Sequence, residues 1–211
     1  MFSRLRNPAG SRSAAGDAID WKRVARWTDD VAAADLKRIR KVFERHTGSA
    51  VELVWEPAKD ALPPVLGFLA EHWFALSAAA AGGPPHLSQI DPFALRPALG
   101  HVIQFDVLDG GADFHCRLYG STIAAISGFD MTGKRLSEFP ASHYVAEYAL
   151  AQSRAACRRR RPLYSRRRPA RAEFVSSWHR LTLPFVDDAG DVARLLIGSL
   201  PTDAEGNIAN Y

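Results

Sequence analysis

The sequence contains little cysteine and no long uninterrupted apolar run. Its two cysteines, Cys116 and Cys157 among 211 residues, are too few for a disulfide framework, so a reducing cytoplasmic location is expected. The most apolar stretch, residues 61–81, is broken by two prolines, a glutamate and a histidine, and no membrane-spanning helix is expected. Residues 1–20 lack the apolar segment of a secretory signal, and residues 1–25 are expected to form a disordered tail.

Motifs of common hydrolases and phosphate-binding enzymes are also missing. The sequence has no Gly-x-Ser-x-Gly, no His-Glu-x-x-His and no Walker segment ending in Gly-Lys-Ser/Thr. The two cysteines lack the spacing of a zinc site. We therefore predict no catalytic residue and no metal site, and we expect the protein not to be an enzyme.

Acidic residues are absent from one segment that is rich in arginine. The chain has 27 basic and 23 acidic residues, and eight of the basic ones lie in this segment, which leaves 19 against 23 elsewhere. The eight are Arg158, Arg159, Arg160, Arg161, Arg166, Arg167, Arg168 and Arg171. The high pI of about 9.3 thus comes from one place, unlike that of a protein that coats nucleic acid over its whole surface.

Two interpretations of the arginine segment stay open. Arginines suit the last turn of a helix and discourage pairing at the edge of a sheet. Alternatively, all eight form a site for an anionic partner, because guanidinium groups match phosphate oxygens. Nucleic acid is the less favoured partner, since only Tyr164 interleaves an aromatic ring. Internal pairing with the acids of the turn at 187–191 is the rival explanation.

The first 85 residues predict helices that precede a separate domain. Apolar spacing indicates a helix over residues 28–45 and another over 64–81, with a possible short strand at 50–55. Gly82-Gly83-Pro84-Pro85 is a strong break. We therefore expect residues 26–85 to form an N-terminal helical extension that packs on the following domain.

Residues 86–203 predict an α+β domain with an antiparallel sheet. The expected strands span residues 101–107, 113–119, 162–168, 173–183 and 192–200, and the expected helices span 121–127 and 144–160. Helices placed between a hairpin and a three-stranded meander should cover one face of this five-stranded sheet. The N-terminal helices or a second subunit should cover the other, and a homodimer using residues 64–81 is expected. Arg117 is expected to pair with Asp106 across the hairpin, or else to contact a partner.

This order of elements is that of the PAS fold, and several short motifs resemble the PAS_5 family of small bacterial proteins. The motifs are Gln89-Ile90-Asp91-Pro92, Asp113-Phe114-His115-Cys116-Arg117-Leu118-Tyr119-Gly120-Ser121, Thr132-Gly133-Lys134 and Leu181-Thr182-Leu183-Pro184. The likeness covers residues 68–201, and it departs from the family at Cys116, where an aromatic residue is usual. The resemblance implies sensing or protein interaction. Because no effector domain follows, a signalling output through a protein partner in trans is expected.

A PAS pocket would lie between the sheet and the inserted helices. Strand alternation indicates its lining as Ile103, Phe105, Ile123, Ser177, His179 and Leu181, with a filled core lacking any ligand as the alternative. The cofactor is open: His143 is a candidate haem ligand, while residues 133–139 lack the cysteine of photochemical flavin domains. The favoured function is a cytoplasmic PAS-type sensory or protein-interaction module. The alternatives are a small-molecule, haem or flavin sensor, or an anion- or nucleic-acid-binding regulator acting through the arginine segment.

Overall fold

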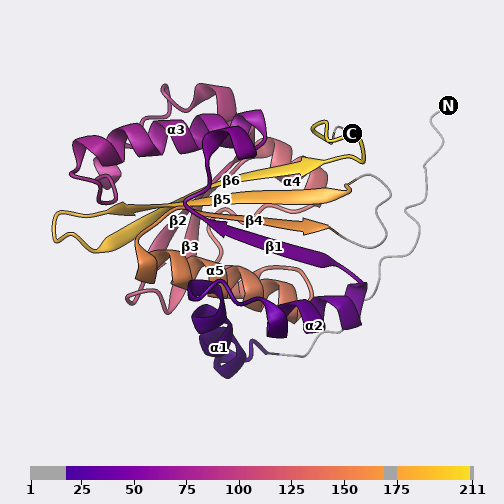
Figure 1. Cartoon of the computed structure of the whole chain (residues 1–211). Coiled ribbons are helices and arrows are strands. Elements are labelled where there is room, and N and C mark those ends of the chain that lie inside the picture. The colour runs from indigo at the N-terminus through magenta and orange to yellow at the C-terminus, as the bar shows by residue number, and fades with distance from the viewer. Residues whose placement is uncertain (1–17, 169–174, 210–211) are drawn as a thin grey trace.

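The computed structural model describes residues 18–168 and 175–209, which form an α+β fold around one antiparallel sheet (Figure 1). The sheet formed by these residues has six strands in the spatial order β1-β4-β5-β6-β2-β3. The strands are β1 (Ala50–Trp55), β2 (Val102–Leu108), β3 (Asp113–Tyr119), β4 (Leu163–Arg168), β5 (Ser177–Val186) and β6 (Val192–Thr202). The expected five-stranded sheet is one strand short, because β1 pairs with β4 and completes that edge.

In the described part of the chain, five α-helices accompany the sheet. They are α1 (Trp21–Ala32), α2 (Lys37–Thr47), α3 (Pro64–Ala79), α4 (Ser121–Ser127) and α5 (His143–Arg159). Four short 3-10 turns are also present: η1 (Lys59–Ala61), η2 (Leu87–Gln89), η3 (Arg96–His101) and η4 (Leu136–Glu138). Strand β3 and helix α4 have the bounds that the sequence predicts. Residues 173 and 174 of the expected fourth strand lie outside the described residues.

The single helix expected over residues 28–45 is wrong, because the chain forms two helices there. Helix α1 begins at Trp21, inside the range 1–25 expected as a tail, and residues 1–17 of that range lie outside the described residues. Ala34 adopts a positive φ of 57° between α1 and α2, which interrupts the helical path. Asp30, expected near a helix start, is buried near the end of α1 and pairs with Arg38 of α2.

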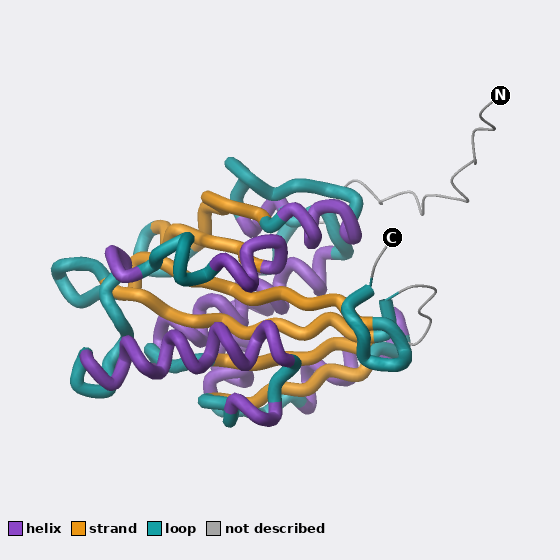
Figure 2. Tube along the Cα trace, turned by 90° about the horizontal axis from the view of Figure 1, so that it is seen from above, coloured by secondary structure: helices purple, strands orange, loops and turns teal. Residues whose placement is uncertain are grey.

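Helix α3 covers one face of the sheet, here called the α3 face (Figure 1). Its Leu66 and Leu69 pack in one apolar cluster with Leu181 and Leu183 of β5. Seen from this side in Figure 2, the helix runs alongside the strands. The approach to β6 depends on Gly198, where an added Cβ would lie 2.6 Å from Leu66 Cδ2. The apolar face that argued for a homodimer is therefore covered within the chain itself.

The opposite face, here called the α5 face, is covered by α5, against which α1 packs (Figure 1), and Ile123 of α4 belongs to the same apolar cluster. The fully buried carboxylate of Glu147 on α5 holds α1 in place. It accepts hydrogen bonds from the backbone N–H of Asp20 and from Arg23 Nη1, both at 2.9 Å. Helices α1 to α3 and strand β1 thus belong to the same layered structure as residues 86–168 and 175–203. Across residues 18–168 and 175–209, no helix combines the length and apolarity that crossing a membrane requires.

Candidate functional site

The six residues expected to line a pocket lie on opposite faces of the sheet. Ile103, Phe105 and Ile123 belong to an apolar cluster on the α5 face. Leu181 belongs to the cluster beneath α3, and the alternation of β5 places His179 and Ser177 on that side as well. The six therefore do not form one pocket. Alternation correctly predicts that positions 177, 179 and 181 share a face, but the packing of α3 decides which face it is.

His179 has a structural environment on the α3 face. Its Nδ1 lies 2.8 Å from the hydroxyl of Tyr164, and its Nε2 lies 3.2 Å from Thr202 Oγ1. Burial, helped by the charge of Arg166, lowers the pKa of His179 to about 4. Both ring nitrogens have partners in the chain, so this neutral histidine does not offer a free polar anchor to a ligand.

Four of the eight arginines of the segment pair with acids from the N-terminal part of the chain. Arg158 lies 2.7 Å from Asp29, and Arg166 and Arg168 each lie 2.6 Å from Glu52 of β1. Arg161 lies 3.7 Å from Glu56, while Arg159 stacks on Trp55 at 4.5 Å. The compensating acids thus come from residues 29–56, and not from the turn at 187–191. Arg171 lies outside the described residues.

A cavity of about 750 Å³ lies among the tips of the two hairpins and the last turns of α5. Its charges are mixed, because acids of both hairpin turns line it together with Arg154, Arg158 and Arg160. Arg154 already donates to the carbonyl of Gly111 at 2.8 Å, and Arg160 donates to that of Gly190 at 2.7 Å. The arginines here are therefore engaged by the fold. Arg117 is likewise paired, at 3.2 Å from Asp106, as the sequence predicts.

Arg167 differs from its neighbours because it projects to the α5 face. Alternation along β4 puts Leu163, Ser165 and Arg167 on this face, while Arg166 and Arg168 meet Glu52 on the other. In the ladder, Ser165 stands opposite Arg180 of β5. Arg180 in turn stands opposite Ser199 of β6. Three polar residues therefore form a row across the middle of the buried sheet.

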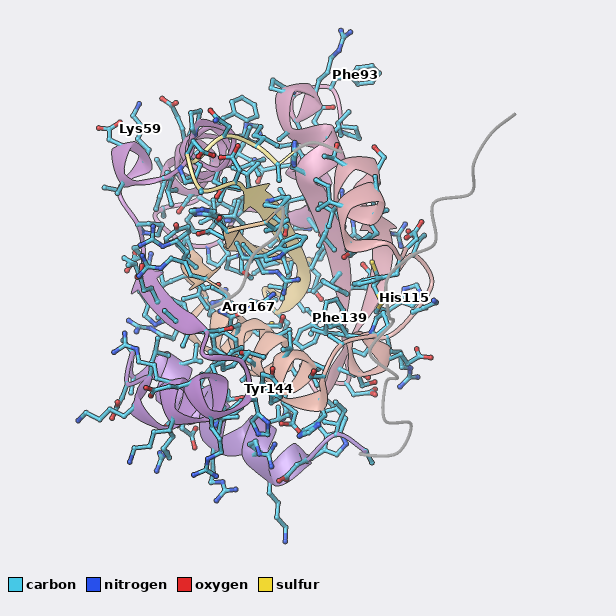
Figure 3. All side chains as sticks on the ribbon, turned by 90° about the vertical axis from the view of Figure 1, so that its right-hand side faces the viewer. Lys59, Phe93, His115, Phe139, Tyr144 and Arg167 are labelled. Carbon is cyan, nitrogen blue, oxygen red and sulfur yellow. The ribbon has the colours of Figure 1, made fainter. Side chains whose placement is uncertain are left out.

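This row meets polar groups from α5 and from the end of β3. We call the set the Arg180 cluster; it comprises Tyr119, Tyr148, Gln152, Ser165, Arg167, Arg180 and Ser199. Tyr119 and Tyr148 are close enough to Arg180 for its charge to act on both phenols. The ring of Phe139 lies 5.9 Å from the Arg180 guanidinium. In the view of Figure 3, the labelled Arg167 and Phe139 lie over the central part of the drawing, whereas Lys59, Phe93 and His115 lie at its outline.

Three atoms of the Arg180 cluster are buried without a hydrogen-bond partner among the described residues. They are the Tyr148 hydroxyl, the Gln152 amide nitrogen and the Ser199 hydroxyl. The side chain of Gln152 is close enough to Tyr148 to act on the pKa of its phenol, but the two side chains do not meet the geometry of a hydrogen bond. Tyr148 and Gln152 are each 6% exposed, and Ser199 is fully buried. A buried polar atom without a partner costs about 1–3 kcal/mol, so native proteins supply partners from the chain, water or a ligand. Their concentration around one arginine marks this layer as the candidate site.

The electrostatics of the cluster follow from burial. Burial lowers the pKa of Arg180 and of Arg167, and in Arg167 the charge of Arg180 acts in the same direction. Burial raises the pKa of Tyr148 and of Tyr119, so both phenols stay protonated donors. The cluster therefore presents hydrogen-bond donors, and it contains no group poised to accept a proton.

Other chemistries have less support in the described residues. His143 of α5 lies beside His46 of α2 at a ring-centroid distance of 6.4 Å. Within the described ranges, no group of three histidine, cysteine or carboxylate side chains is placed to hold a metal ion. Burial raises the pKa of the thiols of Cys116 and Cys157 to about 12, which keeps both in the unreactive form.

Comparisons of the chain with family models, with curated proteins and with solved structures found no match. The resemblance to the PAS_5 family therefore remains an expectation from the short motifs. The geometry of the Arg180 cluster is therefore the evidence that bears on the class of protein.

Sequence reasoning missed most of this cluster, although one signal was present. Arg180 is a charged residue within the strongly apolar strand Trp178-His179-Arg180-Leu181-Thr182-Leu183. A charge in a strand buried on both faces needs a functional or structural reason. Tyr148 and Gln152 are one helical turn apart, a spacing that core residues share, and no pattern separates them from the core.

Proposed function

We propose that this chain is a sensory module that binds a small molecule at the Arg180 cluster, between the sheet and α5. The observation that carries the proposal is the set of unpartnered buried atoms on Tyr148, Gln152 and Ser199. A well-packed core without a ligand would replace such atoms by apolar ones, because removing the polar group relieves its desolvation penalty. A ligand with matching acceptors gives all three a role.

The order of elements after residue 86 supports the same proposal. A hairpin, inserted helices and three further strands are the arrangement from which a PAS-type module was expected, and the cluster lies beneath the inserted helix α5. The donors of the cluster suit binding rather than turnover, so we propose a non-enzymatic module that acts through a protein partner. A homodimer of this module would use a surface other than the α3 face.

The decisive experiment is native mass spectrometry of the full chain purified from its own host. We expect an additional non-covalent mass, with a colourless spectrum above 300 nm. The Tyr148→Phe variant removes one orphan hydroxyl and should lose most of that mass. Its matched control is Tyr164→Phe, because the Tyr164 hydroxyl already pairs with His179 and lies on the other face.

Two results would contradict the proposal. One is a bare chain mass under gentle conditions together with a melting temperature that rises in Tyr148→Phe and does not respond to any added compound. The other is a Soret or flavin band, which would move the function to the haem or flavin alternative.

A further inference from the structure

Arg167 and Arg180 differ from the other arginines by lacking a counter-charge. Among the described residues, neither guanidinium has a carboxylate at ion-pair distance, and neither donates a hydrogen bond. By contrast, Arg158 and Arg161 are paired although they are exposed, and Arg166, which is half-buried like Arg167, is paired as well. The nearby acids thus pair with arginines of the surface, and the half-buried guanidinium groups of Arg167 and Arg180 have no carboxylate beside them among the described residues.

The positions of Arg167 and Arg180 make their charges unfavourable without a counter-charge. Arg180 stands between two serines in the middle of the sheet, and its guanidinium lies against the ring of Phe139. Arg167 lies two positions further along β4 than Ser165, the partner of Arg180, and on the same face. Both side chains are half-buried, so each guanidinium is partly removed from water without a counter-charge, which is unfavourable, and the two charges repel one another. An anion between them would relieve both effects.

We infer that the ligand of the Arg180 cluster is a small organic acid whose oxyanion, a carboxylate or a phosphate, is held by Arg167 and Arg180. This inference rests on the function proposed above and names the chemical class of its ligand. A guanidinium offers a planar fork of donors that matches the two oxygens of such a group. The hydroxyl of Tyr148 supplies a further donor beside Arg180.

The surroundings indicate an apolar body attached to the anion. The ring of Phe139 lies against Phe129 at a centroid distance of 5.3 Å, and Phe129 lies 5.8 Å from the ring of Tyr119. This aromatic wall adjoins the Arg180 guanidinium and has no charged group of its own. Because the cluster lies beneath α5, a small molecule fits this description and a nucleic acid or an acidic protein does not.

The test measures binding by isothermal titration calorimetry with four probes. Benzoate is an aromatic carboxylate, succinate an aliphatic one, AMP an organic phosphate, and inorganic phosphate an anion without an apolar body. We expect at least one organic anion to bind the full-length chain and to raise its melting temperature. Benzoate ahead of AMP would identify a carboxylate, and the reverse order an organic phosphate. Inorganic phosphate binding as tightly as both would overturn the requirement for an apolar body.

Variants separate the two unpaired arginines from a paired one of similar burial. Arg180→Gln should weaken anion binding at least tenfold, and Arg180→Lys, which keeps the charge but loses the fork, should weaken it by a smaller factor. Arg166→Gln is the matched control, one residue from Arg167 but on the α3 face, and should bind as the wild type does. If Arg180→Gln does not fold, Arg180→Lys and Arg167→Gln carry the test.

Distinct results would overturn the inference and the proposed function. A co-purified neutral molecule whose binding is unchanged in Arg180→Gln would overturn the inference and leave the proposed function standing. Absence of any ligand or anion binding would overturn both. Glu173 lies outside the described residues, and Glu173→Gln checks for a counter-charge from the chain itself. If that variant gains anion binding that the wild type lacks, the carboxylate of Glu173 is the counter-charge of the two arginines and the inference is wrong.

Discussion

Lowering the pH from about 7.5 to about 5 is expected to destabilise the fold through one residue, His179. Its side chain is 8% exposed, and burial lowers its pKa to about 4, against an ordinary value of 6.5. In this range the unfolded chain binds a proton that the folded chain rejects. The stability is therefore complete above pH 6.5 and is lost progressively as the pH falls toward 4, with a loss of about 2 kcal/mol at pH 5.

The assay compares the free energy of unfolding in urea at the two pH values. In a chain of this length the loss corresponds to a melting temperature lower by roughly 4–8 °C. The variant His179→Gln keeps polar atoms for Tyr164 and Thr202 but cannot titrate, so its difference between the two pH values should shrink by about 2 kcal/mol. Any packing defect of the variant acts at both pH values and cancels. His46→Gln, at an exposed position on α2, is the control and should keep the wild-type difference.

One result would refute this reasoning. If His179→Gln retains the full pH dependence of the free energy of unfolding, then another group is responsible for that dependence. The pKa of His179 would then be the same in the folded and the unfolded chain.

Two further predictions concern how the helices are attached. Glu147→Gln removes the charge that holds Arg23 and should lower the free energy of unfolding by about 2 kcal/mol, whereas Glu44→Gln on exposed α2 should change it by less than about 0.5 kcal/mol; equal effects in urea would contradict the role of Glu147. Gly198→Ala places a Cβ 2.7 Å from Leu69 Cδ1 and should cost about 1–3 kcal/mol by overpacking. Adding Leu69→Ala should then cost less than it does in the wild type, and strict additivity of the two changes would show that no clash occurs.

The sequence predicts local elements well where their signals are local. Gly120 and Gly128 bracket α4, and the alternation from Asp113 to Tyr119 matches β3 to the residue. The division between α1 and α2 is less accessible, because it depends on Asp30 reaching Arg38 and on a positive φ at Ala34. Neither feature has a signature in residue spacing.

The candidate site could be predicted only in part for a related reason. Strand periodicity groups residues by face, but it does not say which helix will cover that face. His179 and Leu181 were assigned to the wrong layer on this account, while the parity of Arg180 was available and pointed to the other layer. The tertiary structure also determines which arginines form ion pairs. Glu52 reaches Arg166 and Arg168 only because β1 pairs with β4.

The attachment of the N-terminal elements has a consequence for how the chain folds during synthesis. Asp20 bonds to a residue 127 positions later, and Trp73 of α3 bonds to Pro184, 111 positions later. Contacts this distant in sequence slow folding, and apolar surface stays exposed until the segment that covers it has been synthesised. Helix α3 cannot bury Leu66 and Leu69 until β5 and β6 have left the ribosome. We therefore expect nascent chains stopped before residue 160 to be sensitive to protease throughout, and protection to appear in one step when β6 is complete.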